Sequence, residues 1–416
     1  MRAVPRLLYP LAQRDFALFS AAATVSFLGD GVLTVALAFQ VYQLSNVPTA
    51  LSLVILAWTV PLVLLLLVGG TVSDRVDRRL IMVSADLVRF GAIGVTAALS
   101  ISGELRLWHL LLLAPVSGAA TAFFNPASGA LLPDLVPPEQ LAEANGLYGA
   151  AWPLALQLLG PALGGILVAT SGPGLAILFD AFTFAASAGF IFGIRGAPRR
   201  VRPQAGAKAI GELLEGLRFV GRNAWCGASL LGYSLGLLGT RGPVSVLVPY
   251  LVKNGLHTGP AAYGSVVGAW GLGAILASLL AGHLGLPRRP VLVMCAGWGL
   301  SFLGVAVYGA ITTIWQGLGL AFGLGGAHSF GLVIWFTMLQ ARVPRSLLGR
   351  VSGVDWLVSY ALVPVSLAVT GPLSSLLGVR GTFVAGGTFG GLGMLAMLLV
   401  PSVRTAYVAG VASADT

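Results

Sequence analysis

Long apolar runs are the feature of this chain that most constrains its fold. They follow one another through 416 residues, of which 56% are hydrophobic and only 9% are charged. A soluble domain is about 25% charged, because its surface has to be solvated. A helix that crosses the hydrocarbon core of a bilayer needs about 20 apolar residues. The pattern therefore predicts a polytopic membrane protein and excludes a set of soluble domains.

Charged residues, prolines and glycines divide the apolar sequence into twelve predicted membrane-spanning helices. Their ranges are 16–42, 49–72, 80–101, 106–125, 141–169, 173–194, 226–251, 261–284, 290–311, 313–338, 352–376 and 380–401. The first run follows three arginines, but it is too long for a signal peptide and contains Asp30. We expect it to remain as the first span.

The basic residues predict the orientation of these spans. With both termini in the cytoplasm, 19 of the 24 lysines and arginines lie on the cytoplasmic side. Only Arg106, Lys253 and Arg380 then face outward, while Arg89 and Arg241 lie within spans. This bias follows the positive-inside rule, so the net charge of +10 reflects topology. We expect a multi-pass protein of the bacterial cytoplasmic membrane, surrounded by lipid, with no nucleic-acid partner.

One long gap separates the sixth and seventh spans and predicts two domains. Residues 1–195 form an N-terminal six-helix bundle, 196–224 a cytoplasmic linker, and 225–416 a C-terminal six-helix bundle. Apolar linker residues at 210, 213, 214, 217 and 220 follow helical spacing. Either this amphipathic helix lies on the inner membrane surface, or the linker is a solvated connector.

An internal repeat relates the two halves. Matching landmarks recur in order at offsets of 210 or 211 residues: Leu28-Gly29 with Leu238-Gly239, Arg78-Arg79 with Arg288-Arg289, and Gly160-Pro161 with Gly371-Pro372. A duplicated bundle related by an axis along the membrane normal is a known transporter layout. The predicted fold class is an all-α membrane protein with two pseudo-symmetric six-helix bundles.

The loop after the second span carries a recognisable motif. It reads Gly70-Thr-Val-Ser-Asp74-Arg75-Val-Asp77-Arg78-Arg79. With twelve spans and a six-plus-six repeat, the chain resembles the major facilitator superfamily, whose signature here is Gly-x3-Asp-Arg-x-x-Arg-Arg/Lys. Asp77 replaces the usual glycine. Residues 86–89 and 125–137 resemble the bacterial branch that includes the enterobactin exporter and macrolide-efflux proteins.

The resemblance implies the major facilitator fold and alternating access around a midplane cavity lined by spans one, four, seven and ten. It also implies a latch that closes the cytoplasmic side in the outward-facing state. The latch residues would be Gly70, Asp74, Arg75, Arg78 and Arg79, with Asp134 and Asp355 as acidic partners. Alternatively, the arginines only retain the loop inside. Asp355 is expected at the start of span eleven, as a helix cap or as part of the latch.

Span five ends in a motif similar to the antiporter motif of the superfamily. Its residues are Gly160, Pro161, Gly164 and Gly165, although Leu156 replaces an expected glycine. The resemblance implies export, whereas close packing or a kink would need the same residues.

Ionisable residues within the spans are the candidates for proton coupling, because each is costly in hydrocarbon. Asp30 lies near the middle of span one, and Arg241 near the middle of span seven, one position past the repeat equivalent of Asp30. We predict an Asp30–Arg241 interaction across the cavity that protonation of Asp30 would release. A permanent structural ion pair is the alternative.

Four further residues have open interpretations. Asp180 belongs either to an outer gate or to a hydrogen bond within the bundle. His328 in span ten could relay protons, or it could be hydrogen-bonded in a packed bundle. Asp86 and Arg89 share a helical face and are expected to pair structurally with each other or with the inner loops.

Five aromatic residues are candidates for a cavity that accepts bulky substrates, and most of them are expected to be packing residues: Trp58, Trp152, Trp270, Trp335 and Tyr360. The histidines lack metal-ligand spacing, and there is no Walker loop. We therefore expect no metal, no cofactor and no enzymatic activity.

The sequence predicts a secondary active transporter. The leading function is proton-coupled efflux of a small amphipathic compound such as a drug, a siderophore or a secondary metabolite, by a monomer. An importer or lipid translocator of the same fold is one alternative. A transport-inactive membrane scaffold or sensor is an alternative of another class.

Overall fold

The computed structural model describes residues 6–73, 75–195, 206–344 and 347–405, and these ranges contain helices and no strand. The α-helices are α1 (Arg14–Leu44), α2 (Pro48–Ser73), α3 (Arg78–Ile101), α4 (Leu107–Leu131), α5 (Leu141–Ala151), α6 (Gly160–Phe192), α7 (Gly206–Arg222), α8 (Ala224–Gly242), α9 (Val248–Tyr250), α10 (Pro260–Leu284), α11 (Pro290–Gly304), α12 (Ile314–Arg342), α13 (Leu348–Ala361), α14 (Val363–Ala396) and α15 (Pro401–Thr405).

Shorter helical segments extend several of these helices. Three are π-helical, namely η4 (Trp152–Leu159), η5 (Pro243–Leu247) and η6 (Leu251–Gly255). The 3-10 segments are η1 (Arg6–Ala12), η2 (Leu132–Asp134), η3 (Pro138–Gln140), η7 (Val305–Gly309) and η8 (Met397–Leu399).

The described residues contain 10 apolar helical segments long enough to cross a membrane. Two of them, Pro138–Phe192 and Leu348–Leu399, have 55 and 52 residues. At 1.5 Å per residue each would be roughly 80 Å long, more than twice the ~30 Å hydrocarbon core. Each is interrupted by a glycine with a non-helical backbone, Gly172 (φ 80°) and Gly378 (φ 71°). Division at these glycines accommodates the twelve expected spans, and the all-α membrane fold is confirmed.

The chain separates into two compact units. Unit 1 contains Met1–Gln204 and Gly259–Gly268, and unit 2 contains Ala205–Thr258 and Ala269–Thr416. Residues 259–268, at the start of α10, belong to unit 1 because small residues bring them close to α6. A Cβ atom built on Gly264 would lie 2.3 Å from the carbonyl oxygen of Pro161.

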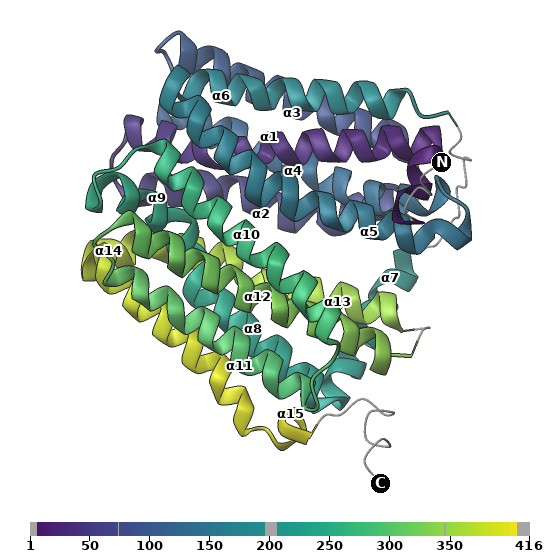
Figure 1. Ribbon diagram of the computed structural model, residues 1–416. Coiled ribbons are helices and arrows are strands. Elements are labelled where there is room, and N and C mark those ends of the chain that lie inside the picture. Colours follow the sequence, from purple (N-terminus) through teal and green to yellow (C-terminus); the bar gives the residue numbers. More distant parts are fainter. Residues whose placement is uncertain (1–5, 74, 196–205, 345–346, 406–416) are drawn as a thin grey trace, which may run out of the picture. The chain divides into compact units, whose positions relative to one another are not determined.

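In unit 1, α6 packs against both α1 and α3, and the three helices lie side by side (Figure 1). Glycines set these distances. A Cβ on Gly29 of α1 would lie 2.1 Å from Thr183 Oγ1 of α6. Likewise, a Cβ on Gly118 of α4 would lie 2.0 Å from the carbonyl oxygen of Trp58 in α2. Larger residues at these positions would force the helices apart.

Unit 2 repeats this arrangement with its own glycines. In unit 2, α8 packs against α14 (Figure 1). A Cβ on Gly239 of α8 would lie 2.4 Å from the carbonyl oxygen of Gly386 in α14. A Cβ on Gly325 of α12 would lie 2.2 Å from the carbonyl oxygen of Trp270 in α10. The close contacts therefore occur at repeat-related positions of the two units.

The helix expected over residues 210–220 lies within α7, which packs against α13 of the same unit. Glu215 forms an ion pair with Arg350. Gly216 faces the backbone of α13, since a Cβ there would lie 2.7 Å from the Arg350 carbonyl oxygen. The location of α7 at the membrane surface stays a prediction.

Candidate functional site

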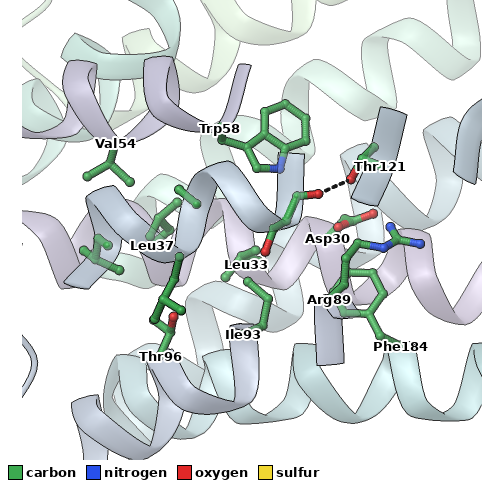
Figure 2. Close-up of a pocket in the computed structure, with 14 residues that line it drawn as sticks. Asp30, Leu33, Leu37, Val54, Trp58, Arg89, Ile93, Thr96, Thr121 and Phe184 are labelled. Carbon is green, nitrogen blue, oxygen red and sulfur yellow. Dashed lines mark hydrogen bonds between the residues drawn. The ribbon is translucent and has the colours of Figure 1, made fainter. Parts of the chain in front are cut away.

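Unit 1 contains an internal cavity between five of its helices. Its volume is about 60 Å³, and its lining comes from α1, α2, α3, α4 and α6. The polar or aromatic lining residues, several of which are labelled in Figure 2, are Asp30, Trp58, Arg89, Thr96, Ser117, Thr121 and Phe184. This volume has room for several water molecules, whereas pockets for drug-sized ligands measure about 300–1,000 Å³. The cavity is therefore suited to water and protons.

Asp30 and Arg89 meet at one end of this cavity. Asp30 lies in the middle of α1, and Figure 2 shows its carboxyl group beside the guanidinium of Arg89 from α3. The two charges interact electrostatically, and Asp86 also acts on Asp30. Asp30 is therefore part of a charged group that spans two helices.

Arg89 forms a buried ion pair with Asp86, one turn earlier in α3. The exposed fractions are 0% for Asp86 and 4% for Arg89. The guanidinium carbon lies 4.5 Å from the ring centroid of Phe124 and 4.3 Å from that of Phe184. Both distances are within the range of cation–π attraction. The expected structural pairing of Asp86 with Arg89 is confirmed, and two aromatic rings hold the cation in place.

Asp180 of α6 completes the cluster. It is fully buried, and its side chain lies against the Gly29 backbone of α1, since a Cβ on Gly29 would lie 2.4 Å from Asp180 Oδ1. Thr183 Oγ1 donates a hydrogen bond to Asp180 Oδ1 at 3.3 Å. The charges of Asp30 and Arg89 both act on Asp180. Three carboxyl groups therefore surround one arginine, and we call Asp30, Asp86, Arg89 and Asp180 the acidic cluster.

The other two proton-coupling candidates, Arg241 and His328, belong to unit 2. Tyr233 Oη and His328 Nε2 are 3.2 Å apart, and Trp298 Nε1 donates a hydrogen bond to the His328 carbonyl oxygen at 2.9 Å. Arg241 interacts electrostatically with His328 and Tyr233. This arrangement matches the hydrogen-bonded packing alternative for His328. The Asp30–Arg241 pair joins different units and remains a prediction.

The arginines of the signature loop tie together the helix ends of unit 1. Arg78 Nη1 donates hydrogen bonds to Asp134 Oδ2 at 2.7 Å and to the Ala130 carbonyl oxygen at 2.9 Å. Arg79 Nη2 donates to the Phe192 carbonyl oxygen at 2.9 Å. The expected pairing of a loop arginine with Asp134 is therefore present.

Other positions of the loop have different surroundings. Asp77 caps α3, because its Oδ1 accepts a hydrogen bond from the Arg79 backbone N–H at 2.9 Å, which gives its departure from the superfamily glycine a structural role. Arg75 is exposed, and a Cβ on Gly70 would meet nothing within 4 Å. Asp74 lies outside the described residues.

The helix-cap interpretation of Asp355 is wrong. Helix α13 begins at Leu348, so Asp355 lies in its interior rather than at its N-terminus. Its side chain is buried and accepts a hydrogen bond from Ser359 Oγ at 3.3 Å. The expected start of this span at residue 352 is four residues too late, because the helix continues through Arg350 although this charge interrupts the apolar run. A role of Asp355 in the latch stays a prediction.

The antiporter-like motif lies at close helix contacts. A Cβ on Gly160 would lie 2.7 Å from the Cα of Gly31, and one on Gly164 would lie 2.8 Å from the Val32 carbonyl oxygen. Gly165 faces the start of α10, with 2.9 Å from its built Cβ to the Cα of Ala261. Pro161 is buried beside them. These contacts agree with close packing, and an export role for the motif stays a prediction.

The aromatic cavity candidates have different environments. Trp58 lines the cavity of unit 1. Trp152 is exposed in η4, and Tyr360 is stacked on Trp356 with 4.9 Å between ring centroids. Trp335 is buried against Trp225 and Trp298 and is a packing residue. Trp270 packs near His328, with 5.8 Å between ring centroids.

Sequence reasoning assigned Asp86 and Arg89 to a separate structural pair and missed their proximity to Asp30. The repeat carried a signal that could have found them. At the 210-residue offset, Asp86 and Arg89 correspond to Ala296 and Gly299. The charged pair is present in only one of the two related bundles. The fold that the bundles share therefore does not require it.

The fold and the site together define a class of protein. Two bundles of apolar helices contain buried ionisable residues, and no metal-binding group of His, Cys, Asp or Glu occurs among the described residues. This is the construction of a polytopic membrane transporter. The chain belongs to the family described as "Transmembrane secretion effector" (MFS_3), whose model matches residues 6–412, and therefore to the major facilitator superfamily. This is a family of transporters and not of enzymes.

Two groups of relatives resemble the chain over most of its length. One is "Multidrug efflux pump Tap" of Mycobacterium tuberculosis, 29% identical over 387 residues that cover 86% of each chain. Another is "Enterobactin exporter EntS" of Citrobacter koseri, 28% identical over 391 residues that cover 91% of this chain and 90% of the relative.

Solved structures support the fold. A POT family transporter in complex with 5-aminolevulinic acid has a TM-score of 0.73 at 12% identity, covering 95% of this chain and 97% of its own. A bacterial homologue of the iron transporter ferroportin has a TM-score of 0.69 at 16% identity, covering 92% and 98%. At these identities the likeness concerns the fold alone.

Proposed function

We propose that this protein is a proton-driven exporter of small amphipathic compounds such as drugs, siderophores or secondary metabolites. The observation that carries the proposal is similarity over 86–91% of the chain to proteins named as a multidrug efflux pump and an enterobactin exporter. The cavity of unit 1 is too small for such compounds, so we propose that the substrate binds at another site that opens and closes by alternating access.

Proton coupling is supported by the position of Asp30. It lies mid-helix in α1, lines a cavity with room for water, and adjoins Arg89. Moving one charge across 100 mV releases about 2.3 kcal/mol, so one or two protons would sustain a useful substrate gradient. We propose Asp30 as the first proton carrier, with Asp180, Arg241 and His328 as further candidates for the coupling pathway.

The surroundings of the protein follow from the charge distribution. We propose a monomer in the bacterial cytoplasmic membrane with both termini in the cytoplasm, because this orientation places most arginines inside. The loop that contains Arg75, Arg78 and Arg79, together with Asp134 and Asp355, would latch the cytoplasmic side during the transport cycle. No cofactor is required.

The proposal is tested by transport in everted membrane vesicles, with a panel of fluorescent amphipathic compounds and with or without a protonophore. We expect uptake into the vesicles that the protonophore abolishes. Asp30→Asn should reach the membrane in normal amount and lose this proton-driven component, because an amide cannot carry the proton. Glu139→Gln, which changes an exposed acid outside the cavity, should transport normally.

Other outcomes point to the alternatives. Full activity of Asp30→Asn would remove this residue from the mechanism. Accumulation in right-side-out rather than everted vesicles would indicate import, and flipping of labelled lipids alone would indicate a lipid translocator. If no compound moves and both Asp30→Asn and Arg241→Ala change only abundance or partner binding, the protein is a membrane scaffold or sensor.

A further inference from the structure

The two halves of the chain allow a comparison within one molecule. Gly29 and Gly239 are repeat-related, and each touches the second part of its long helix, at Asp180 in unit 1 and at Gly386 in unit 2. The positive-φ glycines Gly172 and Gly378 give the same correspondence, since each precedes its partner residue by eight positions. Asp180 of the acidic cluster therefore occupies the place of a glycine.

The other members of the cluster are also charged in unit 1 only. Asp30 corresponds to Thr240, and the pair in α3 corresponds to Ala296 and Gly299 of α11, all at the 210-residue offset. Unit 2 forms the same helix contacts without any of these charges. Since buried charges are costly in a membrane, a fold that does not need them retains them in unit 1 for another task.

The charge balance of the acidic cluster indicates that its task is to bind protons. Three carboxyl groups and one guanidinium would carry a net charge of −2 if all of them were ionised. Like charges at short range in a low-dielectric interior repel strongly, so protons that bind to the carboxyl groups remove most of the cost. Among the described residues, Asp30 and Arg89 are the charged groups that line the cavity, and α2 and α4 contribute neutral residues such as Trp58, Ser117 and Thr121.

Unpartnered atoms support the same conclusion. Asp180 Oδ2 and Arg89 Nε are buried and have no hydrogen-bond partner within the described structure, whereas Ser187 provides a hydrogen bond to Asp86. A buried carboxylate oxygen without a partner is costly, and a bound proton removes the negative charge that makes its burial unfavourable. Asp180 is 0% exposed, so its unpartnered oxygen has no contact with solvent.

We propose that Asp30, Asp86 and Asp180 form one proton-binding network around Arg89, and that the coupling proton binds in unit 1. The inference rests on the proposed function and assigns its proton site. A proton enters from water in the cavity, forms an O–H bond on Asp30 and releases this carboxyl from Arg89. It returns to water when Asp30 pairs with Arg89 again, and no electrons are transferred.

Arg89 is a positioning residue in this network. The rings of Phe124 and Phe184 hold its guanidinium, one side of which is paired with Asp86 while Nε remains available. Because the guanidinium is fixed and has an unused N–H donor, it can donate a hydrogen bond to a second carboxylate without moving. Asp180, which touches α1 at Gly29, would couple the protonation state of Asp30 to the α1–α6 contact.

Infrared spectroscopy of the purified, lipid-reconstituted full-length protein tests the network directly. The wild type should show the carbonyl stretch of protonated carboxylic acids near neutral pH, and this signal should disappear as the pH rises. Asp30→Asn and Asp180→Asn should each remove part of it. Asp86→Asn combined with Arg89→Met removes the ion pair as a unit and should shift the pH midpoint of the remaining signal. Glu139→Gln should change nothing.

Folding is checked by gel filtration and thermal unfolding, and the paired variant avoids leaving a buried Arg89 without its partner. If the infrared signal and its midpoint are the same in all variants, the network is wrong. The network is also wrong if Na⁺, rather than pH, alters the infrared signal. Any one well-folded variant suffices for the comparison.

Transport separates this inference from the proposed function. If a protonophore stops export by the wild type while the infrared signals of all variants are identical, the network is wrong and proton-driven export stands. If the signals change as expected while export ignores the protonophore, the proton-binding network stands and its role in coupling is wrong.

Discussion

At the scale of single residues, glycines decide where charged groups meet. Gly29 has no side chain, so the carboxyl group of Asp180 lies directly against the α1 backbone. The neighbouring position in α1 is Asp30, which faces the cavity. One missing methyl group therefore brings two acids of distant sequence position into one cluster.

This contact predicts a specific cost for Gly29→Ala. The new Cβ would lie 2.1 Å from Thr183 Oγ1 and 2.4 Å from Asp180 Oδ1, so α6 or its side chains must shift. Overpacking of this kind costs about 1–3 kcal/mol. We expect a lower thermal unfolding temperature in detergent and weaker proton-driven transport.

Gly91→Ala provides the matched control in α3. A Cβ at Gly91 meets nothing within 4 Å, and alanine is the better helix former by about 1 kcal/mol. Its unfolding temperature should stay the same or rise. Equal destabilisation by both substitutions would contradict the close α1–α6 contact.

At the scale of elements, α7 is attached to α13 through one face. The Glu215–Arg350 pair is partly exposed, with side-chain exposures of 47% and 32%, and such pairs contribute only about 0–1 kcal/mol. Gly216 makes the tighter contact, because its Cα atom packs against the Arg350 backbone with no room for a side chain. Shape therefore matters more than charge for this attachment.

We expect Gly216→Ala to loosen α7. Its Cβ would lie 2.7 Å from the Arg350 carbonyl oxygen, which belongs to backbone that cannot rotate away. Limited proteolysis of the linker region should become faster than in the wild type. Gly211→Ala, in the same helix with nothing within 4 Å, should leave the rate unchanged. A slower rate for Gly216→Ala than for Gly211→Ala would contradict the docked arrangement.

At the scale of the whole molecule, the two long helical segments determine the number of crossings. Because each is long enough to cross the bilayer twice and has a non-helical glycine, we expect the chain to turn back near Gly172 and Gly378. We therefore predict that Arg6 and Thr405 lie on the same side of the membrane.

Cysteine labelling in intact cells tests this topology. With a membrane-impermeant maleimide, Glu104→Cys and Ser171→Cys should react from outside, whereas Val76→Cys should react only after permeabilisation. The native Cys226 and Cys295 are buried and should remain unlabelled. Labelling of position 171 from the cytoplasmic side alone would mean that Pro138–Phe192 does not cross twice.

The amino-acid sequence alone determined the membrane fold, the helix boundaries to within a few residues, and the superfamily. These properties depend on local stretches of sequence, since insertion of a helix into the membrane requires about 20 consecutive apolar residues. The misplaced start of α13 shows the limit of this reading, because a charge near a helix end does not stop the helix.

Only the tertiary structure decided which ionisable residues meet. The helices are apolar on nearly all sides, so periodicity does not indicate which face of α1, α3 or α6 turns inward. Asp30, Arg89 and Asp180 are brought together by close helix packing across gaps of many residues. Such packing depends on small side chains on two helices at once, which no single stretch of sequence specifies.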